Sequence, residues 1–170
     1  MSFCRATWAT FLRREGEQPT QIDPMKHLFA ATLAFLIALP SAAQSDKEGV
    51  HNAVLDYVLG FYQAEPERFE RSLSKDLVKY GYWTNPEGAY QGSPMNFDQA
   101  VRFASMWNAD NRQGIDENSP KDIVVMEVLD KVAVAKLTAV WGIDYFQLEK
   151  NDGVWQIRHV IWQSHPPSDG

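Results

Sequence analysis

The C-terminal part of the chain constrains the fold most, because strand-like segments alternate there with turn signals. Asn151-Asp152-Gly153 is a strong hairpin signal, and Asp130-Lys131 and Trp141-Gly142 each interrupt an extended pattern. The segments between these turns are rich in β-branched residues or alternate between apolar and polar side chains, and they are residues 122–129, 132–140, 143–150 and 154–163. Short strands joined by tight turns predict an antiparallel meander.

The residues before the meander carry helical patterns. Apolar side chains recur every three or four residues over residues 46–63, and Pro66 suits the first turn of a second, short helix. Asn96, with Gln99 three residues later, has the pattern of a helix cap, and apolar residues up to Trp107 follow on one face. These patterns predict three helices that precede the meander.

A strand hairpin is expected between the second and the third helix. Residues 77–83 are rich in strand formers, residues 85–88 have Asn, Pro and Gly where a type I turn needs them, and residues 89–91 are the expected return strand. Helices and strands are therefore segregated along the chain. This order predicts an α+β fold and not a parallel α/β fold.

The sequence also resembles a known family. The most distinctive matching segment is residues 141–148, and further matching positions occur within residues 54–62, 73–79, 122–136 and 153–162. The sequence departs from the pattern at Ser74-Lys75, where such proteins often have His-Pro. Over residues 46–163 the chain is similar to bacterial proteins labelled putative lumazine-binding, within the nuclear transport factor 2-like superfamily. This resemblance implies a cone-shaped, ketosteroid isomerase-like fold in which N-terminal helices pack on a curved, mainly antiparallel sheet around a pocket. The superfamily hosts isomerases, dehydratases, hydrolases and plain binding proteins, so the resemblance does not choose among them.

Residues 25–43 have the anatomy of a secretory signal peptide. A basic start precedes a run from Leu28 to Leu39 in which only Thr32 is polar, and small residues follow the run. The run is shorter than the roughly 20 apolar residues that cross a bilayer. We therefore expect cleavage after Ala43, with Gln44 as a near alternative, and an exported, periplasmic or secreted product that does not span the membrane. The alternative is a buried core helix.

Residues 1–24 do not fit this anatomy. A signal peptide normally begins at its own methionine, and Met25 fits that role. Residues 1–24 are therefore expected to lie upstream of the true start, or else to be a real extension that is disordered or weakens export. Residues 44–170 are long enough for a single domain with its own core.

Composition excludes several classes of partner. The formal net charge is −6, and it becomes −7 without residues 1–43, which hold four basic and three acidic side chains. Such an acidic domain lacks the basic face that a nucleic acid requires. Cys4 is the one cysteine, which excludes a disulfide scaffold and a thiolate-rich metal site. The histidines have no metal-ligand spacing and no glycine-rich phosphate loop is present, so we expect no metal and no cofactor.

The expected register of the meander brings two charged residues onto its apolar face. With Asn151-Asp152-Gly153 as the loop, Trp155 and Ile157 fall on the open face, whereas Asp144 and Arg158 fall on the face that packs on the helices. Diagonal neighbours on two strands can reach one another. Asp144 and Arg158 are therefore either a catalytic base and a ligand anchor at a pocket floor, or an internal ion pair that fixes the sheet.

Several aromatic residues are candidates for the wall of a pocket. Tyr57, Trp107, Trp141 and Trp162 either line a site for a flat ligand or fill the core. The leading hypothesis is an exported protein that binds a small apolar or aromatic molecule and has no established catalytic activity. The alternative is an isomerase or dehydratase of the ketosteroid isomerase type, in which Asp144 is the base and Tyr57 or Tyr80 is the hydrogen-bond donor.

A third hypothesis is an interaction surface on the sheet. The open face, with Tyr145, Trp155 and Ile157, is expected to form a two-fold homodimer, as is common in the superfamily that the chain resembles.

Overall fold

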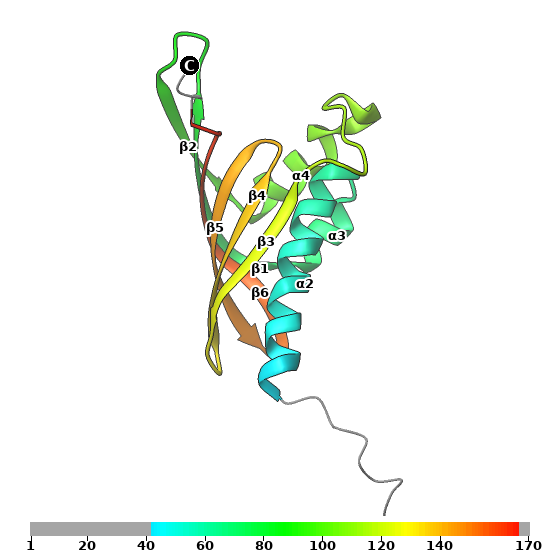
Figure 1. The fold of residues 1–170 in the computed structure, drawn as a ribbon, viewed down its shortest axis with the longest axis vertical. Helices are drawn as coiled ribbons and strands as arrows, with labels where there is room; N and C mark the ends of the chain where they lie inside the picture. The colour runs from blue at the N-terminus through cyan, green and yellow to red at the C-terminus, as the bar shows by residue number, and fades with distance from the viewer. Residues whose placement is uncertain (1–41, 167–170) are drawn as a thin grey trace, which may run out of the picture. The chain divides into compact units, whose positions relative to one another are not determined.

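The computed structural model describes residues 42–166. Its elements, shown in Figure 1, are α2 (Ala42–Tyr62), α3 (Pro66–Arg71), β1 (Leu73–Thr84), β2 (Tyr90–Asn96), α4 (Phe97–Trp107), a 3-10 turn (Ala109–Asn111), β3 (Lys121–Val128), β4 (Val132–Ala139), β5 (Gly142–Asn151) and β6 (Val154–Gln163). Residues 1–24 and the expected signal peptide lie outside the described residues, apart from Ala42 and Ala43, which begin α2. None of the helices in residues 42–166 is long and apolar enough to cross a membrane.

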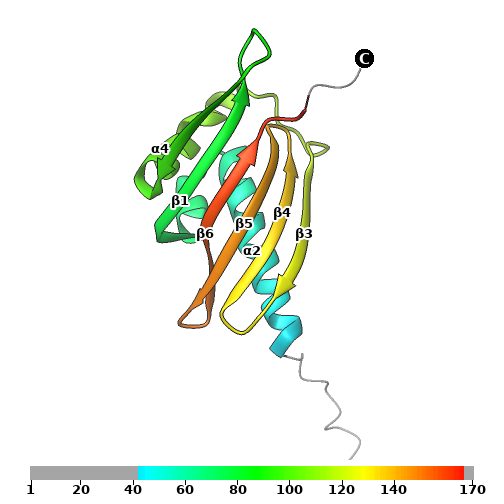
Figure 2. The same cartoon turned by 90° about the vertical axis from the view of Figure 1, so that its left-hand side faces the viewer.

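The strands form one six-stranded sheet in the order β2-β1-β6-β5-β4-β3. Figure 2 shows them side by side, with α2 behind them. All neighbouring pairs are antiparallel except β1 and β6, which run parallel. The predicted α+β architecture, with N-terminal helices and a mainly antiparallel curved sheet, is confirmed.

The helices cover one face of the sheet and build the core with it (Figure 1). Strand β4 alternates between buried and partly exposed residues, and its inward side chains are small, with Ala133, Ala135 and Ala139 almost fully buried. Val50, Val54 and the other apolar residues on one side of α2 are buried in the same cluster. Burying one such aliphatic side chain contributes about 1.5–3 kcal/mol, so this face fixes the helix on the sheet.

Strands β1 and β2 are longer than the sequence pattern predicts. β1 begins at Leu73, directly after α3, and β2 continues to Asn96, where α4 begins. The extra length of β1 follows from its parallel pairing with β6, in which Leu73 lies opposite Ile157. Local patterns could not indicate this partner, because the two strands are distant in the chain.

The predicted turn and the predicted cap are both confirmed. In the turn between β1 and β2, the backbone N–H of Gly88 donates to the Asn85 carbonyl at 2.9 Å. At the start of α4 the Asn96 side chain accepts from the Gln99 N–H at 3.0 Å, and the Gln99 side chain accepts from the Asn96 N–H at 2.9 Å. These reciprocal bonds form a capping box, which fixes where β2 ends and α4 begins.

The register of β5 and β6 differs from the predicted one. Asn151 pairs with Val154, so the loop has two residues, Asp152 and Gly153, both with positive φ (47° and 82°). This one-residue difference turns Trp155 and Ile157 into the core, where they are 5% and 0% exposed. Their predicted place on the open face is therefore wrong.

A β-bulge in β6 then shifts the alternation back by one residue, so that the last residues of β6 lie on the faces of the sheet that the sequence predicts. Gln147 lies opposite His159 and Leu148 opposite Ile157, so Arg158 is the extra residue. Beyond the bulge, Trp162 lies opposite Asp144, as expected for residues that share the inward face.

Candidate functional site

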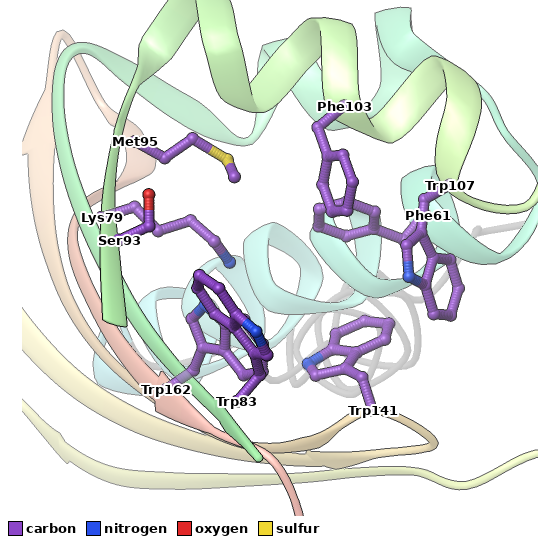
Figure 3. Close-up of a pocket in the computed structure, with 9 residues that line it drawn as sticks. All are labelled: Phe61, Lys79, Trp83, Ser93, Met95, Phe103, Trp107, Trp141 and Trp162. Carbon is purple, nitrogen blue, oxygen red and sulfur yellow. The ribbon is translucent and has the colours of Figure 1, made fainter. Parts of the chain in front are cut away.

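A cavity of about 350 Å³ lies between α4 and the sheet, and Figure 3 shows its wall. Six of the nine lining residues are aromatic. The lining residues are Phe61 from α2, Lys79 and Trp83 from β1, Ser93 and Met95 from β2, Phe103 and Trp107 from α4, Trp141 from the turn between β4 and β5, and Trp162 from β6. Trp83 and Phe103 are 38% and 39% exposed, so they lie where the cavity meets solvent.

Strand β1 places its part of the wall by simple alternation. Leu77, Lys79, Gly81 and Trp83 are separated by two residues each and therefore share one face of the strand. Gly81 pairs with Trp162 on β6, and a Cβ at Gly81 would lie 1.9 Å from the indole nitrogen of Trp162. The missing side chain at Gly81 is thus what lets the Trp162 ring lie across β1 and form part of the wall.

Trp141 joins the wall through contacts with other rings. Its ring centroid lies 5.2 Å from those of Phe61 and Trp107 and 5.6 Å from that of Tyr62, in edge-to-face arrangements. Such pairs are favoured by the quadrupoles of the rings. Trp141 is therefore packed against rings that come from α2 and α4.

Four polar side chains meet beneath this wall and form a buried polar cluster: Tyr57, Lys79, Trp141 and Asp144. The Tyr57 hydroxyl donates to Asp144 Oδ1 at 3.1 Å, and Trp141 Nε1 donates to Asp144 Oδ2 at 2.5 Å. Lys79 Nζ donates to the Tyr57 hydroxyl and lies 3.7 Å from Asp144 Oδ1. Asp144 is fully buried and Lys79 is 5% exposed, so the pair is an internal one.

Burial acts against both charges of this pair. Desolvation raises the pKa of the Asp144 carboxyl above its ordinary value, although the charge of Lys79 and hydrogen bonds from Trp141 and Tyr57 oppose that change. Desolvation lowers the pKa of the Lys79 amine, and the charge of Asp144 opposes it. The pKa of Tyr57 is raised well above its ordinary value by burial and by Asp144, so Tyr57 remains a donor.

The structure brings together most of the residues predicted from the sequence. Trp107, Trp141 and Trp162 line the cavity. Tyr57 and Asp144 do not line it, and they lie beneath it in the buried polar cluster. Their roles toward a ligand stay predictions.

Two predicted residues lie away from the cavity. Tyr80 is on the other side of β1, 37% exposed, with its ring centroid 5.0 Å from that of Tyr82. The predicted proximity of Arg158 and Asp144 is wrong. Because of the bulge in β6, the Arg158 guanidinium is turned to Asp76, with Nη1 3.0 Å from the carboxylate and 2.7 Å from the carbonyl oxygen.

The partner of Asp144 is Lys79, which sequence reasoning did not single out. One signal could have found it, since Lys79 continues the alternation of Leu77 and Gly81, where an inward residue is expected. A lysine at an inward strand position requires a partner or a ligand. Among residues 42–166, no group of three His, Cys, Asp or Glu side chains is arranged to hold a metal ion.

Comparison with known sequences assigns the family. Residues 45–163 match the sequence profile of the family described as "Putative lumazine-binding". The chain belongs to this "Putative lumazine-binding" family. The resemblance expected over residues 46–163 is therefore confirmed. No curated protein was found to match.

Solved structures agree with the family on the fold. One is a nuclear transport factor 2-like protein of unknown function from Methylobacillus flagellatus KT, with 21% identity and a TM-score of 0.51 over 71% of this chain and 93% of that one. Another is a protein of unknown function with a cystatin-like fold from Nostoc punctiforme PCC 73102, with 12% identity and a TM-score of 0.51 over 75% of this chain and 95% of that one. At these identities the likeness shows the fold alone.

Proposed function

We propose that this member of the lumazine-binding family is an exported protein that binds a small, flat, largely apolar molecule in its aromatic cavity. The observation that carries the proposal is the wall itself, in which six aromatic rings and Met95 surround a volume of about 350 Å³. Sites for small organic molecules have volumes from about 300 to 1,000 Å³ and are lined mainly by apolar side chains with a few polar groups. Here the polar groups are Lys79 and Ser93.

The arrangement of the rings favours a planar guest. Trp141, Trp162 and Phe103 surround the cavity from different elements (Figure 3), so a flat molecule can meet ring faces and ring edges together. The family description names lumazine, which is a flat fused-ring compound, and this supports the use of lumazine as one probe. Four tryptophans in the wall make quenching of their fluorescence a direct readout of binding.

The alternative of an isomerase or dehydratase is not favoured by the geometry. That chemistry requires a carboxylate that reaches the ligand. Asp144 is fully buried, both of its carboxylate oxygens accept hydrogen bonds, and it does not line the cavity.

A cavity-filling substitution tests the proposed site. We expect Ser93→Phe to lower the affinity for 2-naphthamide and for lumazine by at least about tenfold, because the new ring occupies the space of the guest. Ser93 is only half-buried on β2, so the free energy of unfolding should change by less than about 1 kcal/mol. The matched control is Val124→Phe, an exposed position on β3, at the opposite edge of the sheet from β2. Titration of tryptophan fluorescence measures the affinity, and equal affinities of the two variants would contradict the site.

Export is the second part of the proposal. It rests on the signal-peptide anatomy of residues 25–43, in which an apolar run follows a basic start and precedes small residues. Expression of the full chain in a bacterium and intact-mass measurement of the periplasmic protein would test it. We expect a mature chain that begins at Gln44 or Ser45, whereas an uncleaved cytosolic product would contradict export.

We also propose a homodimer through the outer face of the sheet. The predicted surface included Trp155 and Ile157, which are buried, but Val78, Tyr145 and Ile161 are 57%, 47% and 54% exposed on that face. Apolar side chains gathered on one sheet face are typical of an interface between copies.

The mass of the domain in solution tests the dimer. Light scattering should give the mass of two chains for the unmodified domain and of one chain for Tyr145→Glu/Ile161→Glu, because the charges would be buried in the interface. Val154→Glu, at the far end of β6, is the control that should stay dimeric. A single-chain mass for the unmodified domain would contradict the proposal.

A further inference from the structure

Lys79 is the one charged residue among those that line the cavity. Figure 3 shows its amine directed into the space between the aromatic rings. A lysine is expensive to bury, and its side chain is 5% exposed here. The wall therefore contains a cationic group at a place where apolar side chains would otherwise be expected.

The hydrogen bonds of the ammonium group are incomplete within the described part of the protein. An ammonium carries three N–H donors. One donates to the Tyr57 hydroxyl, and a second is accounted for by Asp144 Oδ1, 3.7 Å away. Among residues 42–166, Lys79 contacts no further hydrogen-bond acceptor. The third donor is thus left for an acceptor inside the cavity.

The negative partner of Lys79 is turned away from the cavity. Asp144 is fully buried, and its oxygens are covered by the donors of Tyr57, Trp141 and Lys79. On the cavity side the ammonium lies among ring faces, with Nζ 5.6 Å from the ring centroid of Phe61 and 5.5 Å from that of Trp162. A ligand that enters the cavity therefore approaches the Lys79 ammonium and not the Asp144 carboxylate.

From this geometry we infer that the cavity selects planar aromatic molecules with an anionic oxygen attached to the ring, and that Lys79 binds that oxygen. The class includes aromatic carboxylates, phenolates and ionised ring imides. This inference rests on the proposed function, because it names the ligands that the same cavity prefers. An apolar guest would displace water from the ammonium without replacing its hydrogen bond, whereas an anionic oxygen replaces the bond and adds a charge.

The test compares two ligands of the same size and shape, of which one carries an anionic group and the other a neutral one. 2-Naphthoate and 2-naphthamide have the same ring system and the same number of heavy atoms, and at pH 7 the first is an anion. We expect the domain to bind 2-naphthoate at least about tenfold more tightly, since hydrogen bonds to charged groups are worth roughly twice those between neutral groups. Calorimetric titration at low salt measures both dissociation constants.

The matched variants isolate the role of Lys79. Lys79→Met/Asp144→Asn removes both members of the ion pair, so it leaves no unpaired buried charge. In this variant the two compounds should bind with about equal affinity, because the loss of the cation weakens the binding of 2-naphthoate more than that of 2-naphthamide. Lys79→Arg, which keeps the cation, should retain a preference for the anion.

The outcomes separate this inference from the proposed function. If neither compound binds the domain, both are contradicted. If both bind with equal affinity, or if the preference survives in Lys79→Met/Asp144→Asn, the cavity remains a binding site but the inference is overturned. If Ser93→Phe leaves the affinity for 2-naphthoate unchanged, the anion binds elsewhere on the domain, and the inference is overturned as well.

Discussion

Lys79→Met should lower the free energy of unfolding by about 3–5 kcal/mol, because it leaves Asp144 as a buried carboxylate without its cation. Asp144 would keep its hydrogen bonds from Tyr57 and Trp141, but neither donor carries a compensating charge. The loss is therefore much larger than the loss of one hydrogen bond, which is about 1 kcal/mol. Urea unfolding, followed by tryptophan fluorescence, measures the difference.

The same argument predicts that a second substitution restores stability. Asp144→Asn removes the buried charge and keeps an amide that can bond to Tyr57 and Trp141, so Lys79→Met/Asp144→Asn should regain most of the loss. Lys136→Met is the control, since Lys136 lies on the opposite face of the sheet, and it should change the free energy by less than about 1 kcal/mol. A double variant that is no more stable than Lys79→Met would contradict the ion-pair explanation.

The elements that could be predicted from the sequence are those that neighbouring residues specify. The capping box of Asn96 and Gln99 and the turn at Asn85 depend on bonds between residues three or four positions apart, so their residue types are visible in the sequence. The same holds for the strand boundaries of the meander, because each turn interrupts an alternating pattern.

The features that could not be predicted depend on long-range pairing. The parallel pairing of β1 with β6 has no local signal, and it is what places Gly81 against Trp162. The bulge at Arg158 has no local signal in the sequence either. A bulge adds one unpaired residue to a strand, so a prediction based on strict alternation assigns the residues on one side of it to the wrong face. The sequence therefore predicts the wrong partner for Asp144, although the place of Asp144 among apolar residues correctly predicts its burial.

The aromatic part of the site was easier to predict than its charge. Trp107 and Trp162 lie on faces that the sequence already identifies as apolar, so their inward direction follows from periodicity. For Lys79, residue type and strand position disagree. A lysine is expected to be exposed, whereas its position on β1 is one where a buried residue is expected. Such conflicts between residue type and position are expected where a protein binds something.

Gly142→Ala should destabilise the domain by at least about 3 kcal/mol, because the position combines a strained backbone with a close approach of another strand. Gly142 has a φ of 147°, and a Cβ there would lie 1.9 Å from the carbonyl oxygen of Gln163. That oxygen belongs to the backbone of β6, so it cannot rotate away as a side chain could. The methyl group would have to push β5 and β6 apart.

The effect should extend to the cavity, because Gly142 follows Trp141 and lies two residues before Asp144. The matched control is Gly153→Ala, at the next turn, where φ is 82° but nothing lies within 4 Å of an added Cβ. That variant should lose only the cost of a left-handed backbone, about 1–2 kcal/mol, and keep its affinity for 2-naphthoate. Urea unfolding and calorimetric titration of both variants measure the two effects. Equal losses in the two variants would mean that backbone conformation alone, and not the approach of β6, makes glycine necessary beside Trp141.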